Sequence, residues 1–380
     1  MKTVKLSDVV KRANTKEDRF NTSLLYYVGG EHIETDNVVI KERGLIKGST
    51  IGPMFYFGFK KGDVLLVSRN PHLRKSGMVS FDGICSEKTF VLKTNDERIL
   101  LQDYLPFIFQ SDHFWEYAES HKSGSVNFFL NWSTLANYEF NLPDLDEQKK
   151  LAEVLWQIVD TMESYKKLLA KTDEMVKAKY VEQIENDGSK IKREKLNTLC
   201  NFISGGTPDT KHPEYYGGDI PWISTVALGP NYIDKTSAKD FLTELGVNKS
   251  ATHLIKKGTL LFGNRVGVGK TSITNCDMCT NQDILALTDV DAKINILYLK
   301  IVLDMQRNYF ESQKRGATIK GIPIDVLGNI FIPIPPLQLQ NQFADFVQKA
   351  EESKSLIQAS LDSLSAVYKK IIAENLGGSN

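Results

Sequence analysis

The glycine-rich run 263–271 is the part of this sequence that comes nearest to a phosphate-binding motif. A P-loop requires Gly-x-x-x-x-Gly-Lys-Thr, because the length of the loop decides which backbone amides face the phosphates. Asn264 stands where that motif needs its first glycine, and Gly263 lies one residue too early. We therefore favour a turn that displays Asn264, Arg265 and Lys270 over a nucleotide site centred on Lys270. An ordinary hairpin with solvated charges is the remaining alternative.

Two other short motifs fall short of the chemistry that they suggest. Cys276-Asp277-Met278-Cys279 is a lone Cys-x-x-Cys, whereas a structural zinc site needs four ligands, and Cys85 and Cys200 stand in unrelated contexts. Asn70-Pro71-His72-Leu73 is the nearest match to the Asn-Pro-Pro-Tyr tetrapeptide of adenine methyltransferases, and it lacks the second proline and the aromatic residue. We expect no metal site and no catalytic site, which favours a protein that binds rather than catalyses.

The composition describes a chain of two domains without a membrane segment. At 380 residues, with 41% hydrophobic and 25% charged residues, it exceeds one ordinary core and fits two domains with connecting structure. No uninterrupted apolar run is long enough to span a bilayer, and the first residues lack the apolar centre of a secretory signal. Four cysteines favour a reducing cytoplasm. The net charge of zero neither favours nor excludes a nucleic-acid partner.

The positions of these residues depend on an internal repeat. Matching segments follow one another in the same order in both halves, at offsets of 190 to 196 residues. The pairs are Lys5–Val9 with Lys195–Leu199, Gly62–Arg69 with Gly258–Arg265, Gly124 and Leu135 with Gly316 and Leu327, and Leu142–Gln148 with Ile334–Gln340. Four ordered anchors at similar offsets indicate a duplication.

Each half ends in a long segment with the heptad spacing of a coiled coil. Apolar residues recur at alternating intervals of three and four, with Thr172 and Lys354 each filling one position of the pattern, and neither segment contains glycine or proline. The first set is Leu151, Leu155, Ile158, Met162, Tyr165, Leu169 and Val176, and the second is Phe343, Val347, Ala350, Ile357, Leu361, Leu364, Tyr368 and Ile371. Either stripe alone would fit a helix packed on its own domain. Two matching stripes favour helices that pair with each other, and roughly forty residues of helix span about 60 Å.

We predict an α+β fold in four segments. Two mixed α/β domains, residues 1–142 and 188–334, alternate with long helices at 143–187 and 335–376 that form an antiparallel coiled coil. Within the domains we expect strands at 63–68 and 259–262, and helices at 104–120 and 296–313.

The second domain carries the most specific family resemblance. Ile203-Ser204-Gly205-Gly206-Thr207-Pro208, followed by Tyr215–Ser224, resembles the opening of target-recognition domains in Type I restriction–modification specificity subunits. The segments 264–271 and 280–283 resemble later elements of the same domains, and the proline-leucine-glutamine entries to both helices resemble those of the family's conserved helices. The first domain departs from the pattern, because 27–32 stands where a Ser-Gly-Gly-Thr-Pro opening is expected.

The resemblance implies a non-catalytic subunit that recognises double-stranded DNA. Each target-recognition domain would read one half of a bipartite, asymmetric site, and the paired helices would hold the halves apart and dock two methyltransferase subunits. Restriction subunits would then join and supply ATP-dependent cleavage. The resemblance further implies that this chain binds no cofactor, that S-adenosylmethionine, ATP and Mg²⁺ act at partner subunits, and that the complex works in the cytoplasm of a prokaryotic cell.

Within that reading, basic and amide residues on glycine-bearing loops are the candidate DNA contacts. Arginine and asparagine suit bidentate contacts to guanine and adenine, and lysine suits phosphate. The candidates are Ser68, Arg69, Asn70, His72, Arg74, Lys75, Lys122 and Ser125 in the first domain, and Thr207, Thr210, Lys211, Asn264, Arg265, Lys270, Thr318 and Lys320 in the second. Two other functions stay open at this point: a P-loop NTPase centred on Lys270, and a coiled-coil scaffold with protein-binding heads.

Overall fold

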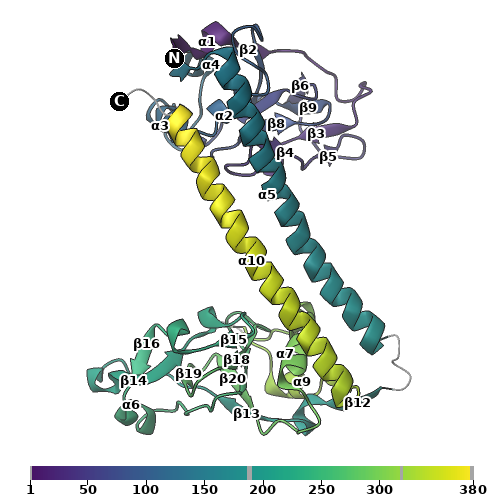
Figure 1. Ribbon diagram of the computed structural model, residues 1–380, viewed down its shortest axis with the longest axis vertical. Coiled ribbons are helices and arrows are strands. Elements are labelled where there is room, and N and C mark those ends of the chain that lie inside the picture. The colour runs from purple at the N-terminus through teal and green to yellow at the C-terminus, as the bar shows by residue number, and fades with distance from the viewer. Residues whose placement is uncertain (1, 186–190, 317–319, 377–380) are drawn as a thin grey trace. The chain divides into compact units, whose positions relative to one another are not determined.

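The computed structural model describes residues 2–185, 191–316 and 320–376. Its contacts divide the chain into two compact units. The first unit comprises residues 1–169 and 356–380, and the second comprises residues 170–355. Each unit therefore combines one globular domain with part of both long helices (Figure 1).

The first unit is built around a five-stranded sheet in the order β2-β10-β7-β8-β4. Its neighbours pair antiparallel except β4, which runs parallel to β8. The strands are β2 (Val10–Ala13), β10 (Thr89–Thr94), β7 (Val64–Val67), β8 (Ser76–Val79) and β4 (Val39–Ile40). A second sheet has the order β5 (Gly44–Leu45), β3 (Tyr26–Val28), β9 (Gly83–Ser86) and β6 (Phe55–Phe59), and β1 (Lys2–Lys5) pairs with β11 (Glu139–Leu142).

The second unit repeats the five-stranded sheet and the two-stranded sheet of this plan. Its five-stranded sheet has the order β13-β20-β17-β18-β15, and again only the last strand is parallel to its neighbour. The strands are β13 (Asn201–Ser204), β20 (Ile284–Thr288), β17 (Leu260–Gly263), β18 (Thr271–Thr274) and β15 (Tyr232–Ile233). A smaller sheet contains β16 (Asp240–Leu242), β14 (Tyr216–Ile223) and β19 (Cys279–Thr280), and β12 (Lys192–Lys195) pairs with β21 (Phe331–Ile334). The predicted duplication and α+β class are confirmed.

Short helices connect the strands of both units. The first unit has α1 (Leu6–Val9), α2 (Leu105–Ile108), α3 (Asp112–Ser120) and α4 (Trp132–Ala136), and the second has α6 (Glu244–Asn248), α7 (Ile296–Met305), α8 (Arg307–Ser312) and α9 (Ile324–Gly328). Thus α2, α3 and α4 of the first unit recur in the second as α7, α8 and α9. The helix predicted at 104–120 is divided, because Ser111 is extended and its hydroxyl accepts the Phe114 N–H as the N-cap of α3. The helix predicted at 296–313 is likewise divided at Gln306.

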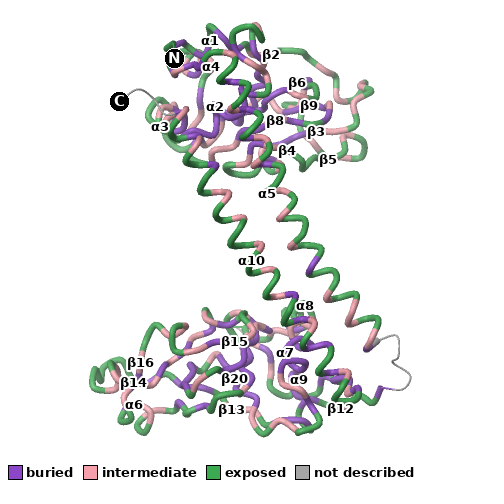
Figure 2. Tube along the Cα trace, in the orientation of Figure 1, coloured by how far each residue is buried: buried purple, intermediate pink, exposed green. Residues whose placement is uncertain are grey.

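The two long helices are α5 (Leu145–Tyr180) and α10 (Leu337–Leu376). A π-helical turn, Val181–Glu185, follows α5. In the second unit, Lys354 pairs with Asp173 at 2.8 Å, and the Phe343 ring lies 5.8 Å from that of Tyr180. The later residue of α10, Lys354, contacts the earlier residue of α5, Asp173, and the earlier residue Phe343 contacts the later residue Tyr180. These parts of the two helices therefore run antiparallel. Figure 2 shows that exposed residues predominate along both helices, whereas buried ones gather in the central strands.

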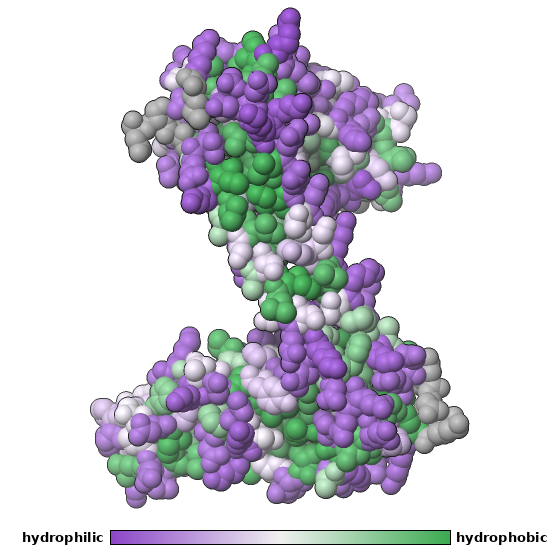
Figure 3. Space-filling model, viewed as in Figure 1, coloured by the Kyte–Doolittle hydropathy of each residue, from purple (hydrophilic) through white to green (hydrophobic). Residues whose placement is uncertain are grey.

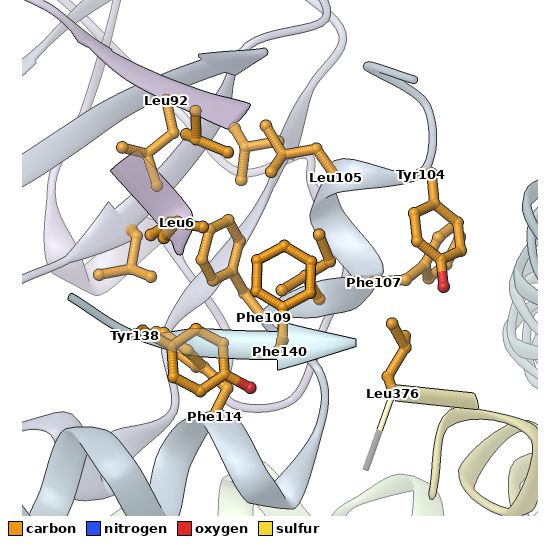
Figure 4. Close-up of a cluster of buried hydrophobic side chains, with 14 of the residues drawn as sticks. Leu6, Leu92, Tyr104, Leu105, Phe107, Phe109, Phe114, Tyr138, Phe140 and Leu376 are labelled. Atoms are coloured by element: carbon orange, nitrogen blue, oxygen red, sulfur yellow. The ribbon is translucent and has the colours of Figure 1, made fainter. Parts of the chain in front are cut away.

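Each unit has its own core. In the first, Tyr104 and Phe107 from the α2 region face Leu376 from the end of α10, and Phe114, Tyr138 and Phe140 form an aromatic group beside them (Figure 4). In the second, Phe343, Ala344 and Val347 of α10 join Leu260, Phe262 and the apolar face of α7. Packing each helix end into a domain core fixes the helix through hydrophobic burial rather than through surface charge.

Candidate nucleic-acid interface

A pair of loops meets at the same place in both units. In the first unit, the β7–β8 loop touches a hairpin closed by mutual hydrogen bonds between Ser123 and Phe129, each 2.9 Å. In the second, the β17–β18 loop touches a hairpin closed between Arg315 and Gly321 by bonds of 2.8 and 3.0 Å. Gly124 and Gly316, which follow the first residue of each hairpin, have φ values of 98° and 131°, so glycine is needed there.

The first loop pair brings together several of the predicted residues. Arg69 forms a β-bridge to Phe129, and its guanidinium lies 5.5 Å from the centre of that ring. The Asn70 amide donates to the Phe128 carbonyl at 2.9 Å. The Lys122 ammonium lies 4.2 Å from the Phe128 ring and also pairs with Glu119. Arg69, Asn70 and Lys122 thus share one half-exposed surface.

At the edge of this surface, His72 and Ser125 are exposed. Val126, beside Ser125 at the tip of the hairpin, is 84% exposed. Polar side chains and one apolar tip on projecting loops suit the edges of bases, where hydrogen-bonding groups and thymine methyls are read.

Three other predicted residues of the first unit are engaged inside the protein. The buried Ser68 hydroxyl donates to the Lys88 carbonyl at 2.8 Å. The Arg74 guanidinium pairs with two carboxylates, Asp36 and Asp112, each at 2.6 Å. The Lys75 ammonium donates to the Gly30 carbonyl. These contacts give all three side chains structural partners, so their role at DNA stays a prediction.

In the second unit, the run 263–271 is the connection of an antiparallel hairpin. Gly263 ends β17, Thr271 begins β18, and Gly263 donates to the Lys270 carbonyl at 2.8 Å. A phosphate loop leads from a strand into a helix, whose free N-terminal amides complete the phosphate cradle. Here a strand follows Lys270, so the geometry does not provide that cradle.

A neighbouring loop, Thr280–Asp283, connects three of the predicted residues. The Thr207 hydroxyl donates to the Gln282 side chain. The Asn264 amide donates to the Asp283 carbonyl at 2.7 Å, and the Arg265 guanidinium lies 3.8 Å from the Asp283 carboxylate. Gln282 and Asp283 belong to a segment that resembles the family but were not selected as contacts. Their types alone did not distinguish them, and only the fold brings them beside the hairpin.

The remaining predicted residues of the second unit are less closely joined. Thr210 and Lys211 are exposed on the loop after Pro208. Lys270 is half-buried, with its side chain beside Gly267. Lys320 is exposed next to Gly321, at which an added Cβ would lie 2.9 Å from Cγ of Arg265. Thr318 falls outside the described residues.

A partly buried ion pair supports the hairpin of the second unit. Lys300 on α7, whose side chain is only 3% exposed, pairs with Asp304 at 2.6 Å. The Thr271 hydroxyl donates to the same carboxylate. Burial raises the pKa of Asp304, while the charge and hydrogen bond of Lys300 act in the opposite direction. The network fixes the start of β18 to α7, and thereby one end of the 263–271 hairpin.

The surface and the thiols give no second indication of a site. On the face drawn in Figure 3, hydrophilic residues cover much of the surface, with hydrophobic areas between them. Cys279 is buried, which raises the pKa of its thiol to about 11. In residues 2–185, 191–316 and 320–376, no group of three or more His, Cys, Asp or Glu is placed to hold a metal ion. No helix in this part of the chain has the length and apolarity to cross a bilayer.

Two solved structures resemble this chain in fold over nearly its whole length. The Type I restriction–modification S subunit of M. genitalium matches this chain with a TM-score of 0.64 and 14% identity. The match covers 100% of this chain and 96% of the S subunit. A structure on complex assembly and conformational transition of a Type I restriction–modification system matches with a TM-score of 0.54 and 18% identity, covering 99% of this chain and 97% of the other. At these identities the likeness establishes the fold alone.

Sequence relatives extend the likeness to particular proteins. The MjaIX specificity subunit of Methanocaldococcus jannaschii is 28% identical over 166 residues, which is 42% of this chain and 38% of that protein. The HindI specificity subunit of Haemophilus influenzae is 27% identical over 124 residues, 32% of this chain and 27% of that protein. The alignments therefore span less than half of each relative.

The family model has the widest coverage. The model described as the Type I restriction modification DNA specificity domain matches residues 1–172 and, a second time, residues 189–366. The two matches follow the internal repeat and cover most of both units. This chain belongs to the family of Type I restriction–modification DNA specificity domains.

Proposed function

We propose that this chain is the sequence-reading subunit of a Type I restriction–modification complex, with one half of a bipartite DNA site read by each unit. The observation that carries the proposal is the pair of equivalent loop surfaces on equivalent sheets, with different residues displayed on each. Because the five-stranded sheets of the two units have matching strand orders, each loop surface lies at the same place on its own domain. Different side chains give each surface a different preference among base edges.

The proposed partners follow from the same family membership. Two methyltransferase subunits would bind the chain, restriction subunits would join them, and the long helices would separate the two reading domains. S-adenosylmethionine, ATP and Mg²⁺ would act at those subunits, and this chain would contribute recognition without a catalytic group. We place this complex in the cytoplasm of a prokaryotic cell, which agrees with four cysteines that form no disulfide.

DNA binding by the assembled complex tests the proposal. The chain would be purified with its proposed methyltransferase partner, and the DNA sequences that the complex retains would be selected from a random duplex pool. We expect a motif with two specified parts separated by an unspecified gap. Selection of no motif would contradict the proposal, and it would favour a scaffold with protein-binding heads.

A further inference from the structure

Asp283 lies beside Arg265, an exposed arginine on the loop surface of the second unit. The Arg265 side chain is 45% exposed, and its Nη1 lies 3.8 Å from Oδ1 of Asp283. The Asp283 side chain is only 14% exposed. The carboxylate therefore faces Arg265 from the protein side, while the guanidinium reaches toward solvent.

The position of the carboxylate is fixed from behind. The Asn281 side-chain amide donates to Oδ2 of Asp283 at 3.3 Å, and the Asp283 amide donates back to Oδ1 of Asn281 at 3.3 Å. The Asp283 carbonyl also accepts the Asn264 amide at 2.7 Å. The two contacts with Asn281 fix the carboxylate within its own loop. The contact with Asn264 joins that loop to the hairpin that carries Arg265.

The other carboxylate oxygen of Asp283, Oδ1, is the one that faces the Arg265 guanidinium. Oδ1 of Asp283 is buried and has no hydrogen-bond partner among the described residues. A buried anionic oxygen without a hydrogen bond is costly, so the cation in front of it is its main compensation. A guanidinium has five N–H donors, and a carboxylate at one edge leaves the others for a second acceptor.

We propose that Asp283 is a positioning residue for Arg265, which it orients toward one base pair of the half-site read by the second unit. This inference rests on the proposed function and adds a residue that acts through Arg265 and not on DNA itself. An arginine held in place loses less conformational freedom on binding, and a fixed orientation favours the two acceptors of guanine over a phosphate.

The proposal predicts opposite effects on specific and non-specific binding. In Asp283→Asn, Arg265 loses its anchor, so affinity for the target duplex should fall about three- to tenfold. The same substitution removes a negative charge close to DNA, so affinity for a scrambled duplex should stay equal or rise. The ratio of target to scrambled affinity should therefore fall about tenfold, mainly at one base pair.

The matched control is Asp277→Asn in the same unit. Asp277 pairs with Lys256 at 2.8 Å on an exposed surface and makes no contact with the hairpin in the described residues. Asp277→Asn removes the same charge as Asp283→Asn, so any general electrostatic effect on DNA binding appears in both variants. We expect its ratio of affinities to equal that of the parent.

Two further variants separate orientation from folding. If Asp283 acts through Arg265, adding Asp283→Asn to Arg265→Ala should not reduce the ratio further. Arg265→Lys keeps the charge and loses the planar fork, so it should lower the ratio while it leaves non-specific affinity unchanged. Thermal unfolding of each variant shows whether the fold is retained.

The measurement is fluorescence anisotropy of the complex with methyltransferase on target and scrambled duplexes, over a series of salt concentrations. An unchanged ratio in Asp283→Asn, or an additional loss in the Arg265→Ala background, would overturn the role of Asp283. A parent complex that binds both duplexes equally would overturn the proposed function itself, and the two failures are therefore distinguishable.

Discussion

The two units share the same five-stranded sheet, and they differ in the contacts that hold the β7–β8 loop of the first unit and the β17–β18 loop of the second. In the first unit, Arg74 pairs with Asp36 and Asp112 and so joins the loop to α3. In the second, the carboxylate at the corresponding place, Asp304, receives the Thr271 hydroxyl and the Lys300 ammonium instead. An equivalent acid holds each loop, but only in the first unit does an arginine of the loop itself supply the donor. Arg265 of the second unit, which the repeat pairs with Arg69 and not with Arg74, is exposed.

The helix entries show the opposite behaviour, because they are nearly identical. The Gln148 amide donates to the carbonyls of Ile99 and Pro143, both at 2.9 Å, and accepts the Leu101 amide at 3.0 Å. Gln340 makes the same three contacts with Lys293, Pro335 and Asn295, at 3.0, 2.9 and 2.9 Å. Both glutamines are fully buried. The contacts that attach each long helix to its domain are therefore the same in both units, whereas the contacts that hold the two loops differ.

Exchange of a whole domain should have the largest effect. Replacing residues 190–333 with another recognition domain of this family should change one half of the selected DNA motif completely. The other half should stay as it was, because the first unit has its own core. The motif would be determined by selection from a random duplex pool. A simultaneous change in both halves would show that the units do not read independently.

Loss of either buried glutamine should destabilise its own unit by a similar amount. Gln340→Ala leaves two carbonyls and one amide without their buried partner, which should cost about 2–4 kcal/mol of unfolding free energy. Gln148→Ala should cost about the same, since its contacts are equivalent. Urea unfolding measures both.

The matched control for this prediction is Gln338→Ala, because Gln338 is exposed two residues before Gln340. It should change the stability by less than about 0.5 kcal/mol. Unequal costs for Gln148→Ala and Gln340→Ala, outside experimental error, would contradict the view that the joint is conserved between the units.

The two arginines should separate stability from recognition. Arg265→Ala should weaken target binding by about 1–3 kcal/mol and relax the preference at one base pair, with little change in stability. Arg74→Ala removes the partner of two carboxylates and should lower stability instead, leaving base preference unchanged. Thermal unfolding and duplex binding would be measured on both variants. Loss of base preference in Arg74→Ala would show that the loops are used alike.

We expect Lys270 to strengthen DNA binding through a phosphate contact that does not depend on the base sequence. If its ammonium contacts phosphate, Lys270→Ala should weaken target and scrambled duplexes similarly and reduce the salt slope by about one. Binding of both duplexes over a salt series gives the slope. A slope equal to that of the parent would place Lys270 outside the interface.

The smallest effect concerns the thiols of the second unit. Burial raises the pKa of Cys279 to about 11, so its reactive thiolate is scarce at pH 8. Cys276 is only half-buried. A maleimide reagent followed by mass spectrometry should label Cys276 first in the native chain, and denaturant should remove the difference. Equal native rates would mean that the second unit opens locally around β19.

The repetitive parts of the fold were predictable from sequence because periodicity is a local property. The heptad spacing predicted the long helices, and the structure places them at 145–180 and 337–376 against the predicted 143–187 and 335–376. The ordered anchors predicted a duplicated frame, which the matching strand orders confirm. Both results depend on spacings within short segments, which tertiary contacts do not change.

The partners of individual side chains were not predictable in the same way. Arg74 was selected for its charge, but Asp36 and Asp112, far apart from it in sequence, become its neighbours only in the fold. Asp283 carries no signal that distinguishes it from other acids until the hairpin lies beside it. The break at Ser111 also depends on a buried cap, whose hydroxyl competes with continued helix. Contacts of this kind require the structure.

Single-molecule methylation sequencing of a host that expresses this chain with its methyltransferase tests the central claim most directly. If two independent readers share one frame, methylated adenines should lie in a motif with two unlike halves and a gap of constant length. Domain exchange at 190–333 should then alter one half only. A single continuous motif, or two identical halves, would contradict the claim that the two units read different sequences.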